Sequence, residues 1–153
     1  MKESLDKARQ ELKRADHLIF VSLKYTRTVD IIKNIIERLI NAYDLGIESL
    51  FRYAKSKKKI SSFPTAPLER ANTIKEMFSD DALLANFLNL YRLFRKIKTA
   101  KFSRTNEYRR HVMMTAFLDK GEVEISIDII TDYFDRTNEF VDYCSSMSGG
   151  KND

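Results

Sequence analysis

Apolar side chains recur every three or four residues along most of this chain, a spacing that is typical of amphipathic helices. The first stripe predicts a helix over residues 3–24, with Leu5 and Leu12 on its inner face. A second stripe runs from Ile32 to Ala54 and predicts a helix of about 28 residues. Thr28 precedes it and is a suitable capping residue, because its hydroxyl oxygen can accept a free amide of the first turn.

Glycine and proline divide the middle of the chain. Gly46 lies inside the second predicted helix, where glycine costs about 1 kcal/mol relative to alanine and usually permits a neighbouring helix to pack closely. Ser61–Pro67 is the clearest loop, and its Thr65 and Pro67 predict the start of a third helix. Residues 79–81 (Ser-Asp-Asp) are a second capping signal, followed by a helix along Leu83 to Ile97.

A further helix is predicted from a cap at Ser103 to Gly121, because Tyr108, Val112 and Thr115 fall at helical spacing.

Apolar residues then alternate over positions 123–129. This pattern predicts an extended entry to a last helix capped by Ser126, with a short strand as the open alternative. The inner face of the last helix includes Tyr133, Val141 and Cys144.

These elements predict an all-α fold, an up-and-down bundle of four to five helices over residues 1–146. Residues 147–153 are polar and contain two glycines, so they are expected to form a disordered tail. The chain has only four Gly and two Pro in 153 residues, which is too few for a sheet protein with frequent tight turns.

Several classes of function lack their sequence signals. Cys144 is the only cysteine, so neither an intramolecular disulfide nor a cysteine-based metal site is expected. No Gly-rich phosphate loop and no His-Glu-x-x-His motif occurs, and no cofactor or metal is predicted. The N-terminus has no signal-peptide pattern, and the longest apolar-rich window, Leu18–Leu23, is far shorter than the ~20 residues that span a bilayer. A cytoplasmic protein without a membrane segment is expected.

Charge is segregated along the chain. Residues 92–111 contain eight basic side chains and one acid, although the whole chain carries a net charge of only +5. Residues 119–142 contain eight acids and two basic side chains. The basic stretch favours a polyanionic partner such as RNA, with Arg95, Lys98, Lys101, Arg109 and Arg110 as candidate contacts. The alternative is a structural protein in which the two stretches pair, within one chain or between two subunits.

Arg104 and His111 are the candidate chemical pair. On one continuous helix, seven residues make nearly two turns, so both side chains leave the same face with Cα atoms roughly 10 Å apart along the axis. Arginine supplies bidentate donors for a phosphate, and histidine exchanges a proton near neutral pH. Together they suffice to cleave RNA without a metal, by attack of the 2′-hydroxyl on the adjacent phosphate. The ordinary alternative is a solvated surface histidine.

The same residues carry a resemblance to a known family. Two long helices and a loop are followed by Phe-Ser-Arg104-Thr-Asn-Glu-Tyr108-Arg-Arg-His111, and a closing helix contains Asn138-Glu-Phe-Val141. This order resembles the HEPN-domain superfamily, small all-helical proteins common in archaea and bacteria. The hallmark of that superfamily is an arginine followed, after four to six residues, by a histidine, and six residues separate the pair here.

The resemblance implies a homodimeric bundle and a metal-independent ribonuclease, often a toxin paired with a nucleotidyltransferase antitoxin. Arg104 would hold the scissile phosphate and His111 would transfer the proton, with Asn106 and Tyr108 as supporting polar groups. Thr105 departs from the pattern, because active members often have Asn, Asp or His directly after the arginine. Many relatives lack the histidine, so the alternative is a non-catalytic module that binds RNA or a nucleotidyltransferase-type partner.

Overall fold

The computed structural model describes residues 2–58 and 60–148, and most of them are helical. The first helical stretch consists of α1 (Lys2–His17), a π-helical turn η1 (Leu18–Ser22) and α2 (Leu23–Tyr25). The other helices are α3 (Val29–Ser56), α4 (Pro67–Met77), α5 (Ala82–Thr99) and α6 (Ile127–Met147). Five helical stretches therefore occur among the described residues, and the coarse prediction of a helical bundle is confirmed.

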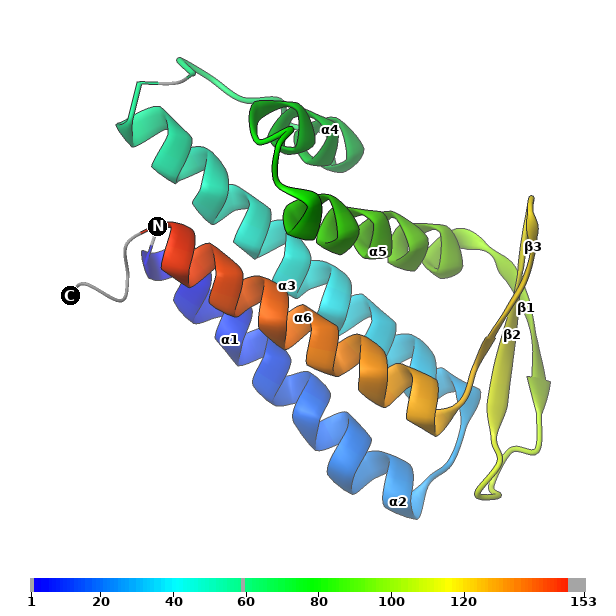
Figure 1. Ribbon diagram of the computed structural model, residues 1–153. Coiled ribbons are helices and arrows are strands. Elements are labelled where there is room, and N and C mark those ends of the chain that lie inside the picture. Colours follow the sequence, from blue (N-terminus) through cyan, green and yellow to red (C-terminus); the bar gives the residue numbers. More distant parts are fainter. Residues whose placement is uncertain (1, 59, 149–153) are drawn as a thin grey trace.

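The long helix α3 occupies the centre of the bundle and packs against α1, α4, α5 and α6 (Figure 1). Its Tyr43 is fully buried and stacks on two rings from other helices. The ring centroid of Tyr43 lies 4.4 Å from that of Phe140 in α6 and 5.4 Å from that of Tyr91 in α5. These stacked rings join the three helices in one core, because buried aromatic pairs add to the free energy gained by removing their surfaces from water.

Three predicted helix caps are confirmed by hydrogen bonds. The side-chain oxygen of Thr28 accepts the amide of Ile31 at 3.4 Å, and that of Asp81 accepts the amide of Leu84 at 2.9 Å. Ser126 caps α6 in the same way, at 3.2 Å from the Ile129 nitrogen. Helix α4 begins at Pro67 as predicted, although Ala66 rather than Thr65 occupies its capping position.

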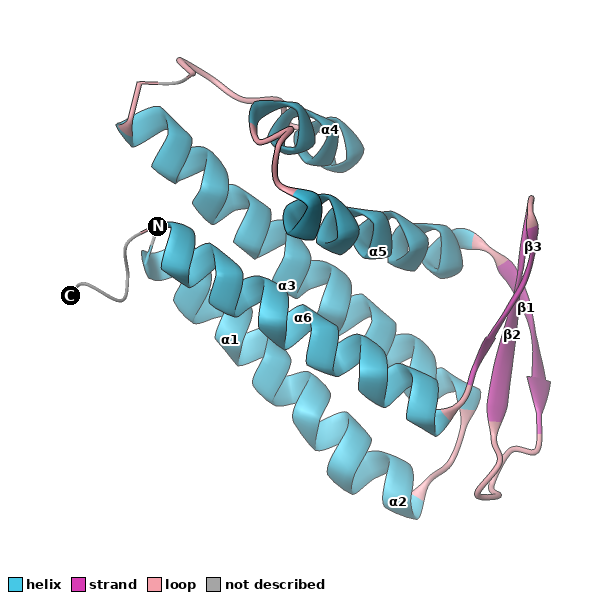
Figure 2. Cartoon of the chain, viewed as in Figure 1, coloured by secondary structure: helices cyan, strands magenta, loops and turns pink. Residues whose placement is uncertain are grey.

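Between α5 and α6 the chain forms a small antiparallel sheet, in the spatial order β1 (Lys101–Thr105), β2 (Met113–Leu118) and β3 (Gly121–Ile125). Figure 2 shows the strands together at one end of the helices. The predicted helix from Ser103 to Gly121 is therefore wrong. The open alternative of a short strand before α6 is correct for residues 121–125.

The sheet forms because the backbone amides and carbonyls of neighbouring strands hydrogen-bond with one another. Thr105 pairs with Met113, and Lys101 pairs with Phe117, so residues 106–112 become a hairpin loop. The central strand β2 has three successive buried residues, Met114, Thr115 and Ala116, and does not alternate as a one-sided strand does. Gly121 begins β3 with φ +139, a backbone conformation that side chains rarely adopt.

Helix α6 extends to Met147, with Ser148 at its C-cap. The remaining residues of the predicted disordered tail, 149–153, lie outside the described residues. No helix of the described chain combines the length and the apolar character that a membrane crossing requires.

Candidate functional site

Arg104 and His111 lie on the β1–β2 hairpin rather than on one helix. Arg104 belongs to β1, opposite Met114 of β2, and His111 lies in the loop. The expected geometry, with both side chains on one helical face, is therefore wrong.

The Arg104 guanidinium forms ion pairs with two carboxylates near the start of α3. Its Nη2 atom lies 2.9 Å from Asp30 Oδ1, and its Nη1 atom lies 3.4 Å from Glu107 Oε2. The guanidinium also lies 5.2 Å from the centre of the Phe102 ring. The hydrogen bond to Asp30, together with the negative charge of Glu107, raises the pKa of Arg104. These contacts make Arg104 a link between the hairpin and the beginning of α3.

The hairpin loop is closed by its own hydrogen bonds. The amide of Arg109 donates to the Asn106 carbonyl, and the amide of Val112 donates to the Arg109 carbonyl, each at 3.1 Å. The Asn106 side-chain amide donates to the His111 carbonyl at 3.4 Å. Asn106 and Tyr108 both have left-handed backbones, with φ 55 and φ 67. Non-glycine residues in that region cost of order 1–3 kcal/mol each and persist only where the surroundings hold them.

The surroundings that hold the loop are the connection between α2 and α3. The Tyr108 amide donates to the Arg27 carbonyl at 2.7 Å, and the Val29 amide donates to the Glu107 carboxylate at 2.9 Å. Val29 is the first residue of α3, so Glu107 places a negative charge at the positive end of that helix. The loop and residues 26–28 therefore form one fixed unit at this end of the bundle (Figure 1).

Two tyrosines, one in this unit and one directly before it in sequence, are exposed to solvent. The Tyr108 residue is 75% exposed, and Tyr25, at the end of α2, is 85% exposed. A tyrosine ring that packs against nothing contributes little to folding, and it offers a flat apolar face to a ligand. Tyr108 was predicted as a supporting polar group, whereas its backbone anchorage and exposure favour a role for the ring itself.

Four cations near these tyrosines are unpaired. The side chains of Lys24, Arg27, Arg109 and Arg110 form no hydrogen bond or ion pair with another described residue. By contrast, Glu107 in the loop and Asp30 in the first turn of α3 are both engaged by Arg104. The surface made by residues 24–27 and 106–111, here called the loop surface, therefore carries uncompensated positive charge.

A pocket of about 440 Å³ opens beside the loop surface. The first helical stretch contributes Phe20 and Lys24 to its lining, the connection to α3 contributes Arg27, and the hairpin contributes Arg110, His111 and Met113. Asp128 and Thr131 of α6 complete the polar part of the wall. The Nε atom of Arg27 is buried and has no hydrogen-bond partner. His111 is thus brought together with Arg110 and two cations that are distant in sequence, and not with Arg104.

The other predicted RNA contacts are divided by the fold. Arg109 and Arg110 belong to the loop surface. The Nη2 atom of Arg95, by contrast, lies 3.1 Å from Asp44 Oδ2, and its Nε atom donates to the Tyr91 hydroxyl at 2.7 Å. Burial alone would lower the pKa of Arg95, and the hydrogen bond to Tyr91 with the charge of Asp44 outweighs that effect and raises it. Lys98 and Lys101 are exposed near the opposite end of the hairpin, with Lys101 roughly 13 Å along β1 from the loop.

Sequence reasoning missed the contribution of Lys24, Tyr25 and Arg27. The available signal was the polar stretch between two helices that ends in the Thr28 cap, since a short connection places its side chains at one end of a bundle. What the stretch did not reveal was its contact with the loop, which depends on the Tyr108 amide.

Pairing of the basic and acidic stretches within one chain, the structural alternative, is absent from the described residues, where no ion pair joins residues 92–111 to residues 119–142. Pairing between two subunits stays a prediction. The acids of α6 pair elsewhere, Asp132 with Arg136 and Asp142 with Arg9. Nor do three or more His, Cys, Asp or Glu side chains of the described chain come together as metal ligands.

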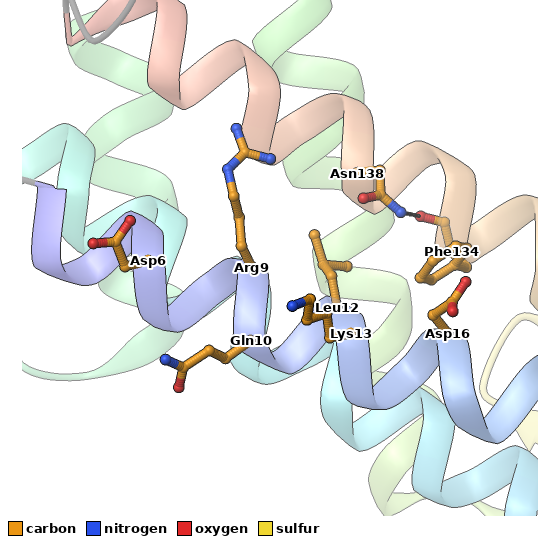
Figure 3. Close-up of a pocket in the computed structure, with 8 residues that line it drawn as sticks. All are labelled: Asp6, Arg9, Gln10, Leu12, Lys13, Asp16, Phe134 and Asn138. Atoms are coloured by element: carbon orange, nitrogen blue, oxygen red, sulfur yellow. Dashed lines mark hydrogen bonds between the residues drawn. The ribbon is translucent and has the colours of Figure 1, made fainter. Parts of the chain in front are cut away.

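A larger groove, of about 530 Å³, runs between α1 and α6. Figure 3 shows Arg9 reaching from α1 toward α6, and Asn138 with its side-chain amide on the Phe134 carbonyl. Its α1 side carries two acids, Asp6 and Asp16, and between them two bases, Arg9 and Lys13. Opposite charges side by side give little net attraction for an anion, so the loop surface is the stronger candidate.

The chain matches no known family model, and no curated protein or solved structure shows significant similarity to it. The geometry of the loop surface therefore carries the functional argument.

Proposed function

We propose that this protein binds single-stranded RNA at the loop surface. The observation that carries the proposal is an exposed tyrosine, Tyr108, fixed through its backbone in a loop that also holds two unpaired arginines. Unstacked bases of single-stranded RNA stack on aromatic rings, while arginine and lysine neutralise the phosphates. A rigid ring beside free cations is suited to both contacts.

The proposed partner is a polyanion, as the sequence predicts, but the side chains expected to contact it differ. Arg95 is engaged within the bundle, so Lys24 and Arg27 replace it beside Arg109 and Arg110. Membership of the HEPN superfamily, a homodimer and a nucleotidyltransferase-type partner all stay predictions.

Replacing Tyr108 by alanine should weaken RNA binding by roughly 5- to 150-fold, because stacking of one base contributes ~1–3 kcal/mol. Tyr108→Phe keeps the ring and should bind nearly as well as the wild type. Fluorescence anisotropy with a labelled uridine 12-mer measures both affinities. Equal affinity of wild type and Tyr108→Ala would contradict the stacking role.

The charge contribution is tested by salt dependence in the same assay. The double variant Arg109→Gln/Arg110→Gln should reduce the slope of log affinity against log salt by about 1.4, since each phosphate contact on a single strand contributes ~0.7. Lys55→Gln/Lys57→Gln removes the same charge at the far end of α3 and is the matched control. An equal loss in both variants would indicate general attraction rather than a site.

Metal-independent RNA cleavage is a second candidate, favoured by the position of His111 in the pocket wall with Arg27 and Arg110. The phosphate would be held by these arginines, because Arg104 is occupied by Asp30 and Glu107. The 2′-oxygen would form a bond to phosphorus and displace the 5′-oxygen, with His111 accepting the 2′-hydroxyl proton and water protonating the departing 5′-oxygen.

The chain offers a matched control for that chemistry, because it has only two histidines. RNA incubated with EDTA should be cut by wild type and by His17→Gln, and should stay intact with His111→Gln. Cleavage by all three proteins, or by none, would remove the nuclease hypothesis while leaving RNA binding unaffected.

A further inference from the structure

The pocket beside the loop surface has walls of two chemical kinds. Phe20, Leu23 and Met113 make one part apolar, whereas Arg27, Arg110 and Asp128 carry charge. The Phe20 residue is 46% exposed, and its ring is held edge-on to that of Phe134, with the centroids 6.2 Å apart. A volume of about 440 Å³ with apolar walls and a few polar groups is typical of a small-ligand site.

The charged groups in this pocket have no ion-pair or hydrogen-bond partners among the residues that the structure describes. The Arg27 Nε atom is buried without an acceptor in the described part of the chain, and an unpaired buried donor is destabilising. Arg110 and Lys24 are likewise free of ion pairs among the described residues. An anionic group in the pocket would lie beside all three cationic side chains.

Asp128 narrows the identity of the ligand. Its carboxylate lines the same pocket, is exposed, and forms no hydrogen bond or ion pair with any described side chain. A carboxylate accepts hydrogen bonds and repels phosphate, so a ligand consisting of phosphate alone does not suit this wall. A ligand that combines an anionic phosphate with a donor edge satisfies both sides.

Among the RNA bases, guanine offers the donor edge that fits a carboxylate best. Its N1–H and N2–H groups lie side by side and donate to the two oxygens together, as in other bidentate pairs. Adenine and cytosine each place an acceptor next to their amino group, which would face the carboxylate unfavourably.

From this geometry we infer that the pocket takes the guanine base of a guanosine nucleotide. Asp128 accepts from the base edge, Phe20 provides an apolar face for the ring, and Arg27 and Arg110 receive the phosphate. The inference rests on the proposed function in so far as the nucleotide belongs to RNA. The same chemistry would also bind a free guanine nucleotide.

The test compares a uridine 12-mer with versions that carry one central guanosine or one central adenosine, together with free GMP and AMP. Guanosine should raise the affinity of wild type roughly tenfold or more over adenosine, the discrimination expected of one bidentate base contact. Asp128→Asn should bring the guanosine-to-adenosine ratio close to one. Asp135→Asn removes the same charge from an exposed position of α6 and should keep the wild-type ratio.

The possible outcomes distinguish the two proposals. Equal affinity for the guanosine and adenosine oligonucleotides, or a ratio unchanged in Asp128→Asn, overturns the guanine assignment and leaves RNA binding in place. Selective binding of GMP, with no binding of any oligonucleotide, supports the pocket and overturns RNA binding. A guanine preference that Asp128→Asn abolishes in the oligonucleotides supports both.

Discussion

Replacing Gly46 by valine is expected to lower the free energy of unfolding by about 3 kcal/mol, at the upper end of the usual cost of overpacking a core. A Cβ atom at this position would lie 2.6 Å from Phe140 Cε2 and 3.3 Å from the Cys144 sulfur. The Phe140 ring cannot move aside easily, because it is fully buried and stacked on Tyr43. In thermal unfolding, the loss corresponds to a decrease in Tm of roughly 6–12 °C for a domain of this size.

A double-mutant cycle checks that the cause is steric. Gly46→Ala alone should cost less than valine, because alanine regains about 1 kcal/mol of helix propensity. In a Phe140→Leu background the ring atom is gone, so Gly46→Ala should become neutral or stabilising. Denaturant unfolding measures all four proteins. Additive effects, with alanine equally destabilising in both backgrounds, would contradict a clash with Phe140.

The helices could be predicted because their stabilisation is largely local in sequence. The stripe of α3 repeats at helical spacing from Ile32 to Ala54, and its cap at Thr28 is three residues from the amide that it accepts. Gly46 was also predicted to permit close packing, and its partner proved to be Phe140 on α6. The identity of that partner depends on how the helices pack together, and the spacing of apolar residues within one helix does not specify it.

The hairpin could not be predicted in the same way. Its loop uses Asn106 and Tyr108 in left-handed conformations, so no glycine or proline marks the turn. The small number of glycine and proline residues favours helices for the chain as a whole, but it does not exclude one short sheet. The strands are decided by pairs such as Thr105 with Met113 and Met114 with Ile125.

The fold brings only some of the predicted site residues together. Arg109, Arg110 and His111 lie on the proposed surface, but the role expected of Arg104 changes because Asp30, 74 residues earlier, occupies its guanidinium. No local pattern signals a partner at that distance. The same long-range contacts explain why residues 24–27 join the site.

Glu107 connects the folding of α3 to the shape of the loop, and Glu107→Ala should therefore affect both. Its carboxylate accepts the Val29 amide, the first of α3, at 2.9 Å. Loss of a hydrogen bond to a charged group costs ~1.5–3 kcal/mol, and the amide of Val29 would also lose its partner. We expect a decrease of about 2 kcal/mol in the free energy of unfolding. RNA affinity should decrease as well, because Tyr108 follows Glu107 directly and depends on the loop for its strained backbone.

Two variants separate this coupling from a simple loss of charge. Glu107→Gln keeps an oxygen acceptor for the Val29 amide and should retain most of the stability. Asp30→Asn removes one negative charge from the same helix end, but its carboxylate is 72% exposed, and an ion pair so exposed contributes ~0–1 kcal/mol. If the hairpin is held mainly by its hydrogen bond to α3, then Glu107→Ala alone should reduce stability and RNA affinity together. A loss of the same size in Asp30→Asn would instead assign the effect to the ion pair of Arg104.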